Sequence, residues 1–384
     1  MDNFIVSARK YRPSTFNSVV GQEHITSTLK NAIKSGQVAQ AFLFCGPRGV
    51  GKTTCARIFA KALNCDHLTA DNEPCNECDS CKAYNNSASF NVYELDAASN
   101  NSVDDIRNLV EQVRIAPIGA KYKVYIIDEV HMLSSSAFNA FLKTLEEPPA
   151  YAKFILATTE KHKIIPTILS RCQVYDFKRI KDADIVKYLQ YVAKNEGVVA
   201  EDEALHIVAR KADGALRDAL SIFDQLVSFT GNNITYQATI QNLNVLDVDN
   251  YFKMVDYLFD ADSSKALLLF DEIISSGFDE QNFIAGLASH FRNLLMAKDS
   301  NTVQLLEVSD TVKERYEKQA SNADKNLMLR ALELANTCDF NYKASNNKRL
   351  SVEICLMQIN ANYVYLKNRP VAMVAPVRQS REGR

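Results

Sequence analysis

Several features that would narrow the function of this chain are missing from its 384 residues. No apolar run approaches the roughly 20 residues of a membrane-spanning helix, so we expect no membrane association. The first residues lack a basic stretch followed by a long apolar core, so we expect no secretion signal and a cytoplasmic location. Neither sign of charge dominates, because 44 basic and 46 acidic residues leave a net charge of −2. Any nucleic-acid contact must therefore come from a local patch or an assembled surface.

The chain is long enough for two or three domains, and 47% of its residues are apolar. Residues 1–178 alternate short apolar runs, typical of buried strands, with helical segments, which predicts a mostly parallel sheet covered by helices on both faces. The expected strands are residues 41–45, 92–95, 124–127 and 154–158. We expect the helix over residues 135–147 to end at the two following prolines, because proline lacks a backbone N–H donor.

The rest of the chain reads as helical. Residues 179–243 carry apolar side chains at helical spacing, interrupted at Gly214, which predicts a small helical domain. Residues 244–366 show the same spacing, with apolar faces such as that of Tyr251 and Leu258, and predict a third domain. Residues 367–384 have prolines, small residues and arginines without periodicity, so we expect a disordered tail.

The strongest motif is a phosphate loop of the pattern G-x-x-x-x-G-K-[ST], with an expected strand before it and a helical stretch after it. Its glycines let backbone N–H groups surround an anion, and the helix adds the positive end of its dipole. Lys52 is expected to reach the β- and γ-phosphates, and the Thr53 hydroxyl to bind Mg²⁺. A glycine-rich loop that merely turns would have no use for these two residues. The predicted nucleotide-binding residues of the loop are Gly46, Pro47, Arg48, Gly49, Val50, Gly51, Lys52, Thr53 and Thr54.

Two carboxylates, Asp128 and Glu129, follow a later apolar strand. In a phosphate-loop fold the first acid at this place binds Mg²⁺, directly or through water, and the second can polarise the attacking water. Asp128 is therefore the expected magnesium residue beside Thr53, and Glu129 the expected general base. The alternative interpretation is that these two acids have no catalytic role and are simply the polar residues that end a strand. We expect His131 to be structural.

Three further places could act on the terminal phosphate. Thr158 and Thr159 end a strand, where a hydroxyl could hold the attacking water, although threonine also suits a strand. Arg171 follows a short helix and could serve its own site or reach a neighbour's site as an arginine finger. Arg217 lies in the first turn of a helix, where a cation is disfavoured unless it pairs with an anion. A phosphate or the nearby Asp218 could be that anion.

Four of the nine cysteines are clustered with the spacing C-x9-C-x2-C-x2-C. In a chain without an export signal, clustered thiols bind metal more often than they form disulfides. Four thiolates suit tetrahedral Zn²⁺, while an iron–sulfur cluster and buried thiols are the alternatives. We predict a structural zinc module over residues 65–81 with the ligands Cys65, Cys75, Cys78 and Cys81. The scattered cysteines, expected to be core residues, are Cys45, Cys55, Cys172, Cys338 and Cys355.

This combination of motifs closely resembles the gamma/tau subunits of bacterial DNA polymerase III clamp loaders, which are AAA+ ATPases. The residues that carry the resemblance are 8–13, 19–24, the phosphate loop, 128–131, 142–149 and 170–172. The resemblance is strong over residues 1–240 and weak beyond them. It implies an α/β P-loop NTPase (AAA+) domain with a zinc-binding insert, a small helical lid domain, and an all-α C-terminal oligomerisation domain.

By that resemblance the chain would be an ATP-driven motor subunit of the polymerase holoenzyme that helps to load the sliding clamp on primed DNA, with ATP, Mg²⁺ and Zn²⁺. Its partners would be the other subunits of a hetero-pentameric ring, the clamp and primed DNA. The residues bordering the adenine would be Tyr11, Arg12, Pro13, Val19 and Val20. Thr158 or Thr159 would be sensor 1, Arg171 the finger acting in trans, and Arg217 sensor 2. Longer family members carry extra C-terminal domains that bind polymerase and helicase.

Other functions remain as alternatives. A helicase loader or an initiator on the same AAA+ fold would be expected to carry its own DNA-reading element, which we do not find. A small-molecule kinase would give no role to Arg171 or to a third helical domain. A non-catalytic scaffold would not need an intact Lys52 and Glu129.

Overall fold

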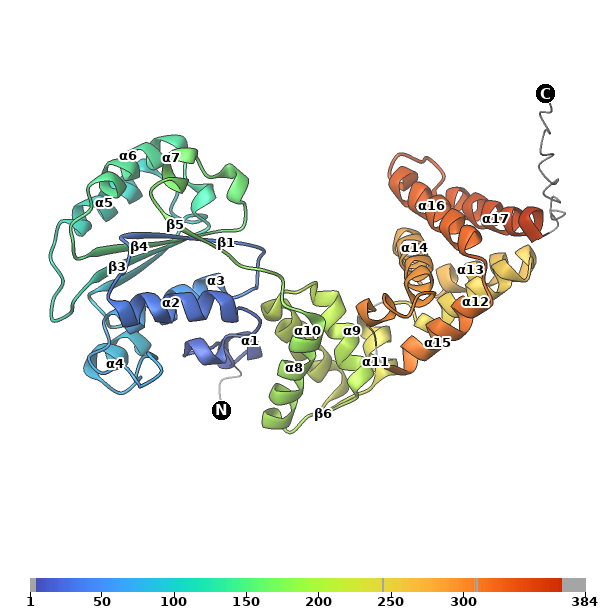
Figure 1. Ribbon diagram of the computed structural model, residues 1–384, viewed down its shortest axis with the longest axis horizontal. Helices are drawn as coiled ribbons and strands as arrows, with labels where there is room; N and C mark the ends of the chain where they lie inside the picture. The colour runs from blue at the N-terminus through green and yellow to red at the C-terminus, as the bar shows by residue number, and fades with distance from the viewer. Residues whose placement is uncertain (1–4, 244, 307, 309, 368–384) are drawn as a thin grey trace, which may run out of the picture. The chain divides into compact units, whose positions relative to one another are not determined.

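The computed structural model describes residues 5–243, 245–306, 308 and 310–367. The chain divides between Ala238 and Thr239 into two compact units. The first unit contains a five-stranded sheet with its covering helices and a further group of helices, and the described part of the second unit is helical (Figure 1).

The sheet has the strand order β2-β3-β4-β1-β5, and every neighbouring pair is parallel. Its strands are β1 (Ala41–Cys45), β2 (Val92–Asp96), β3 (Lys123–Asp128), β4 (Ala152–Thr158) and β5 (Gln173–Asp176). All residues of β1 and β4 are buried, as expected for strands covered on both faces. The four predicted strands are confirmed to within two residues at each end. The edge strand β5 was missed, because only one of its four residues is buried and it therefore lacks an apolar run.

Helices cover both faces of this sheet (Figure 1). On one face α2 and α3 pack through Leu29 and Phe59, and on the other α5 and α6 pack through Ile106 and Phe141. The elements are α1 (Ser7–Lys10), η1 (Phe16–Ser18), α2 (Glu23–Ser35), α3 (Lys52–Leu63), α4 (Asp79–Asn85), α5 (Val103–Val113), η2 (Val130–Met132), α6 (Ser135–Glu146), η3 (Lys161–Lys163) and α7 (Pro166–Leu169). The predicted end of α6 before the two prolines is confirmed.

The strand order decides where a site can form. Because β4 lies between β1 and β3, the carboxyl ends of these three strands meet at one edge of the sheet. The phosphate loop leaves β1 there, Thr158 ends β4, and Asp128 ends β3. Ligands of open parallel sheets bind at this kind of edge.

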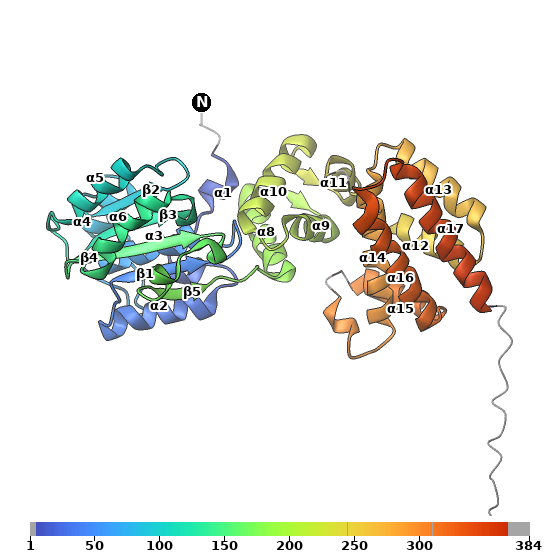
Figure 2. The ribbon, with the colours of Figure 1, turned by 90° about the horizontal axis from the view of Figure 1, so that it is seen from above.

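The helices after the sheet form the small helical domain expected from the sequence (Figure 2). They are α8 (Asp182–Glu196), α9 (Asp202–Ala212) and α10 (Leu216–Thr230), accompanied by the two-residue strands β6 (Val199–Ala200) and β7 (Asn233–Ile234). The predicted interruption at Gly214 has a clear cause. Gly214 has φ +77°, and a Cβ there would lie 2.6 Å from Cβ of Arg179, so only glycine fits.

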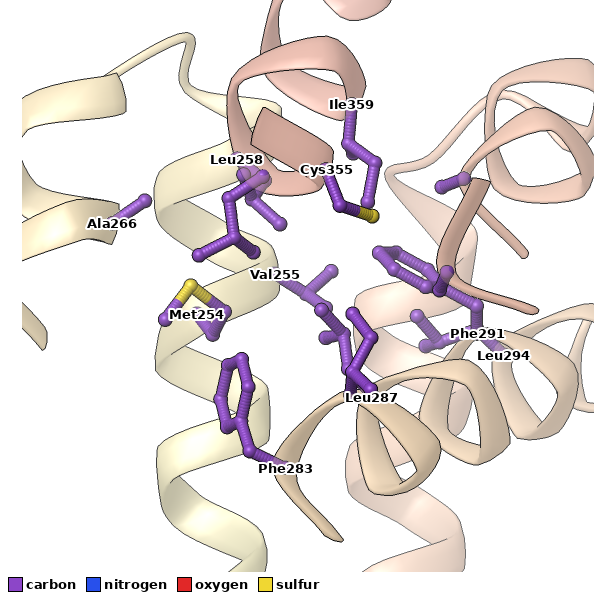
Figure 3. Close-up of a cluster of buried hydrophobic side chains, with 14 of the residues drawn as sticks. Met254, Val255, Leu258, Ala266, Phe283, Leu287, Phe291, Leu294, Cys355 and Ile359 are labelled. Atoms are coloured by element: carbon purple, nitrogen blue, oxygen red, sulfur yellow. The ribbon is translucent and has the colours of Figure 1, made fainter. Parts of the chain in front are cut away.

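The second unit is a packed group of helices, and α11 (Tyr236–Leu243) leads into it. Met254, Val255 and Leu258 lie in its core with Phe283 and Leu287 (Figure 3), which confirms the predicted apolar face. The elements are α12 (Val248–Phe259), α13 (Ser263–Ser275), α14 (Glu280–Ala297), η4 (Val303–Leu305), α15 (Asp310–Ser321), α16 (Lys325–Tyr342) and α17 (Lys348–Lys367). Among the described helices, none has the length and apolar composition that crossing a membrane requires. The tail predicted over 367–384 lies outside the described residues, apart from the last residue of α17.

A polar network is buried in this second unit around His290, which is 2% exposed. The amide nitrogen of Gln319 donates to the carbonyl of Phe252 (2.9 Å) and to Oδ1 of Asp256 (2.7 Å), which leaves its oxygen facing Nε2 of His290 at 2.9 Å. Nε2 therefore carries the proton, and Nδ1 accepts from the Tyr316 hydroxyl at 3.1 Å. This arrangement requires a neutral ring, and burial lowers the pKa of His290 to about 4.

Mild acid should therefore destabilise the protein. Between its unfolded pKa of 6.5 and its folded pKa of about 4, His290 takes up a proton in the unfolded chain but not in the folded one. This difference is small at pH 7 and grows as the pH falls through 6.5, reaching about 2 kcal/mol at pH 5. Urea unfolding followed by circular dichroism should show this loss between pH 7 and pH 5, and His290→Asn should reduce it. An equal loss in the variant would contradict the assignment.

Candidate functional site

The carboxyl edge of the sheet borders a cavity of about 450 Å³, which the phosphate loop, the N-terminal segment and the start of α10 enclose. Predicted site residues that line it are Tyr11, Arg12, Pro13, Val19, Val20, Arg48, Gly49, Val50, Gly51, Lys52, Thr53, Thr54, Asp128, Glu129 and Arg217. Lining residues that sequence analysis missed are Ala8, Asp96, Ala98, Ile180, Leu216 and Leu220. Asp96 had a signal in the sequence, because it directly follows a predicted strand, and the structure pairs it in register with Asp128.

The conformation of the phosphate loop requires its glycines. Gly46 has φ +147°, and a Cβ there would lie 2.5 Å from the carbonyl oxygen of Phe177. Gly49 has φ +77°, and its Cβ would lie 2.9 Å from Cβ of Ala215 in the helical domain. The loop also touches α10 directly, since the N–H of Arg217 donates to the carbonyl of Gly49 at 3.4 Å. The loop thus packs closely against the start of the helical domain.

Lys52 is a buried cation whose partners are loop carbonyls. Its Nζ donates to the oxygens of Gly46 (2.8 Å) and Pro47 (2.7 Å), and the residue is 5% exposed. Burial lowers the pKa of Lys52, while the nearby Glu129 and Asp128 oppose this shift. A desolvated ammonium gains strongly from an anion placed beside it, so the loop is suited to a negatively charged ligand.

The two predicted magnesium residues lie side by side although 75 positions separate them. The Thr53 hydroxyl donates to Oδ2 of Asp128 at 2.5 Å, and Oδ1 of Asp128 accepts from the N–H of Glu129 at 3.0 Å. A hydroxyl and a carboxylate are oxygen ligands of the kind that Mg²⁺ prefers. These two residues therefore fit a magnesium ion.

Glu129 has an unusual backbone and a defined side-chain partner. Its φ of +47° places it in the left-handed region, which non-glycine residues rarely adopt. Its Oε2 accepts from the backbone N–H of Thr159 (3.2 Å) and from the Thr159 hydroxyl (2.9 Å). The predicted general base is thus held by one of the two threonines at the end of β4.

Thr158 has a different environment. It is fully buried, its Oγ1 lies 3.0 Å from Nδ1 of His131, and it accepts from the N–H of Glu160 at 3.0 Å. The other nitrogen of His131 lies 3.1 Å from Oε2 of Glu160, and Nδ1 is 3.4 Å from Oε2 of Glu129. The ring of His131 therefore links Thr158 to two carboxylates, one of them the predicted base, a contact that sequence analysis did not foresee.

The two predicted arginines occupy different places. Arg217 is exposed and lines the cavity, and the described residues show no ion pair between it and Asp218. Arg171 does not line the cavity. Its guanidinium pairs with Glu146 at 2.9 Å and donates to the carbonyl of Thr167 at 2.9 Å.

The four clustered cysteines are brought together as predicted. The Sγ atoms of Cys65, Cys75, Cys78 and Cys81 all lie within 4.8 Å of one another. Sulfur–sulfur distances of 3.5 Å (Cys65 to Cys75) and 4.0 Å (Cys75 to Cys81) bracket the roughly 3.8 Å that tetrahedral Zn²⁺ requires with Zn–S bonds of about 2.3 Å. Backbone N–H groups of Glu77 and Cys78 point at Sγ of Cys75 and lower its pKa to about 6. The donor set fits a structural metal ion.

Comparison with known families covers most of the chain. Residues 21–181 match the family model described as "DNA polymerase III, delta subunit", and residues 184–232 match "DNA polymerase III clamp loader subunit, ATPase lid domain". Residues 248–359 match "DNA polymerase III delta subunit, C-terminal domain". The parallel α/β core, the lid and the helical C-terminal domain predicted from the sequence are thereby confirmed.

Individual relatives decide the family. The chain is 42% identical to DNA polymerase III subunit tau of Bacillus subtilis, over 91% of this chain and 62% of that one. It is 37% identical to DNA polymerase III subunit gamma of Buchnera aphidicola, over 77% of this chain and 81% of that one. The chain belongs to the DNA polymerase III gamma/tau subunit family. The predicted resemblance is therefore confirmed.

The chain spans only part of the longer members of this gamma/tau family. It is 40% identical to the Escherichia coli subunit tau and spans 46% of that protein. Among solved structures, the RuvB Holliday junction branch migration motor of Thermotoga maritima is 20% identical with a TM-score of 0.46, over 65% of this chain and 79% of that one.

Proposed function

We propose that this chain is an ATPase motor subunit of a bacterial replicative clamp loader, which hydrolyses ATP within the DNA polymerase III holoenzyme to load the sliding clamp on primed DNA. One observation carries the proposal. In a chain of the gamma/tau family, Lys52, Thr53, Asp128 and Glu129 converge on a cavity that the lid residue Arg217 also lines.

In this proposal the phosphate loop binds the triphosphate of ATP, with Lys52 exchanging loop carbonyls for the β- and γ-phosphates. The adenine lies against the N-terminal segment, where Tyr11, Pro13, Val19 and Val20 supply apolar surface to the same cavity. Thr53 and Asp128 hold Mg²⁺, which would withdraw electron density from the phosphate oxygens.

Glu129 acts as the general base that orients the attacking water. Thr159 donates to its Oε2 twice, which orients the carboxylate and leaves Oε1 to accept from that water. We assign sensor 1 to Thr159, because its hydroxyl reaches the base, whereas Thr158 is buried against His131. Arg217 acts as sensor 2 and draws the lid toward the γ-phosphate.

Arg171 acts in trans on the nucleotide of the neighbouring subunit. Its absence from the lining of its own cavity supports this role. The pair with Glu146 holds the guanidinium near the end of α7. A cation at this position would complete the nucleotide site of another protomer.

The cysteine cluster binds one structural Zn²⁺, and the sulfur spacing supports this metal. The four thiolates leave no position for a reacting group, so the module has no catalytic role of its own.

We also propose the division of the chain into an AAA+ domain (1–178), a lid (179–243) and an oligomerisation domain (244–366). Exposed apolar side chains in the last of these, such as Phe340 at 86% exposure, support a role in subunit contacts. The partners are the other subunits of a hetero-pentameric ring, the clamp and primed DNA, all in the cytoplasm.

Phosphate release tests this function. ATP turnover should be slow for the chain alone and rise by about 10³- to 10⁵-fold when partner subunits, clamp and primed DNA are added together, because the neighbour's arginine completes each site. Omission of primed DNA is the matched control. Phosphate transfer to a nucleotide or sugar without any response to DNA and clamp would contradict the proposal and favour a kinase.

A further inference from the structure

A buried carboxylate connects the cysteine module to the wall of the nucleotide cavity. Glu73 precedes Cys75 by two positions and is 5% exposed. Its Oε2 accepts from the N–H of Phe16 at 2.7 Å, and its Oε1 accepts from the N–H of Asn17 at 2.9 Å. These are the first two amides of η1, which have no partner within a helix, so Glu73 caps this turn with charge-assisted hydrogen bonds.

The capped turn leads directly into the cavity. Lys30 reinforces the cap, because its Nζ donates to Oε1 of Glu73 (3.2 Å) and to Oδ1 of Asn17 (2.6 Å). Phe16 is 1% exposed and belongs to the same core cluster as Val19 and Val50. Val19 and its neighbour Val20 then line the cavity. Glu73 thus fixes one end of the turn whose other end forms the proposed adenine wall.

Hydrogen bonds hold the loop on both sides of Glu73, and the one that follows it belongs to the cysteine cluster. The N–H of Glu73 donates to the Thr69 hydroxyl at 3.1 Å, which shapes the loop before it. After it, the N–H of Cys75 donates to Sγ of Cys65 at 3.4 Å. Cys65 follows the end of α3, so the loop that carries Glu73 is closed by two metal-ligand candidates.

A second contact joins the module to the phosphate-loop helix itself. Lys61 on α3 is 5% exposed, and its Nζ donates to Oδ1 of Asn76 (2.5 Å) and to Oδ1 of Asn85 (3.3 Å). Asn76 lies between Cys75 and Cys78. The cysteine module is therefore bonded both to the helix that follows the phosphate loop and to the turn that precedes the adenine wall.

We propose that metal binding at the cysteine cluster sets the nucleotide affinity of the cavity, with Glu73 as the positioning residue that transmits the effect to Val19 and Val20. This inference rests on the proposed ATP site. With metal bound, the loop over 65–81 is held and Glu73 stays under η1. Without metal the loop loosens, and the buried N–H of Phe16 and the half-buried N–H of Asn17 lose their acceptor, which destabilises the wall. Because such coupling is reciprocal, nucleotide should also tighten metal binding.

The test measures the dissociation constant of a fluorescent non-hydrolysable ATP analogue on the whole chain. Two samples are compared, the zinc-loaded chain and the chain after dialysis against a zinc-selective chelator. Magnesium is restored after dialysis, and atomic absorption measures the zinc content of both samples. Stripping the wild type should raise the constant about tenfold, which corresponds to about 1.4 kcal/mol. Glu73→Gln should raise the dissociation constant by a similar factor while the variant keeps its zinc. Removing zinc from this variant should then raise the constant little further. Asp71→Asn, which alters an exposed carboxylate in the same loop, should behave as the wild type.

Each other outcome overturns the inference at a defined point. Equal affinity of the zinc-loaded and stripped wild type would exclude the coupling. Fully additive effects of stripping and Glu73→Gln would exclude Glu73 as the route. Circular dichroism checks that the zinc-stripped wild type and Glu73→Gln are both folded. If one of them is unfolded, the other is measured alone, and an unchanged dissociation constant in that form overturns the inference. Failure of the zinc-loaded wild type to bind the analogue would overturn the ATP site as well, whereas normal binding with no effect of zinc would overturn only the coupling.

Discussion

Replacing Arg171 with alanine should lower ATP turnover by the assembled ring by about 10³- to 10⁵-fold, the usual contribution of an arginine finger. Nucleotide binding by the isolated chain should remain unchanged, because Arg171 does not line its own cavity. The loss would arise at the neighbouring site, where the guanidinium stabilises charge that develops on the transferred phosphoryl group. Phosphate release by the ring with clamp and primed DNA measures the first effect, and analogue binding measures the second.

Lys34→Ala is the matched control for this experiment, because it removes an exposed cation near the end of α2. It should leave both measurements unchanged. Arg171→Lys should recover little activity, since an ammonium cannot form the paired hydrogen bonds of a guanidinium. If the isolated chain hydrolysed ATP as fast as the ring, Arg171 would have no role in trans.

Lys52→Ala should weaken nucleotide binding at least about 100-fold, which corresponds to about 2.7 kcal/mol and to the loss of one or two charge-assisted hydrogen bonds. The wild-type ammonium is desolvated and bonded to the carbonyls of Gly46 and Pro47, so it already occupies the loop that would hold the phosphates. Titration with a fluorescent ATP analogue measures the effect.

The change should not act through unfolding, because alanine is a good helix former at the first position of α3. Thermal unfolding of Lys52→Ala beside the wild type checks this point, and Lys34→Ala again serves as the control for loss of a cation. Tight ATP binding by a folded Lys52→Ala protein would show that the phosphate loop has been assigned wrongly.

The parts of the site that sequence predicted well are those in which local spacing carries the chemistry. The phosphate loop and the cysteine cluster are each contained in a short stretch, so their residues had to lie close together in almost any fold. Asp128 and Glu129 were identified by their place after an apolar strand, and the parallel sheet then brought Asp128 to Thr53.

Other features depend on contacts that spacing does not encode. The choice between Thr158 and Thr159 rests on which side chain reaches Glu129 and which reaches His131, and adjacent residues on a strand end give no sign of that in the sequence. The strand β5 went unrecognised because an edge strand needs no continuous apolar run. Glu73 resembles any acidic loop residue until its carboxylate is found beneath η1, 57 positions away.

The sequence by itself determined that a loop with the phosphate-loop pattern, a pair of strand-end acids and a four-thiol module belong to one α/β chain, because periodicity and short motifs are properties of neighbouring residues. Only the tertiary structure decided which groups share the cavity, which threonine contacts the predicted base, and that the thiol module is bonded to the turn before the cavity wall. Strand order brings together side chains that are far apart along the chain. Burial then requires a hydrogen-bond partner for each polar group.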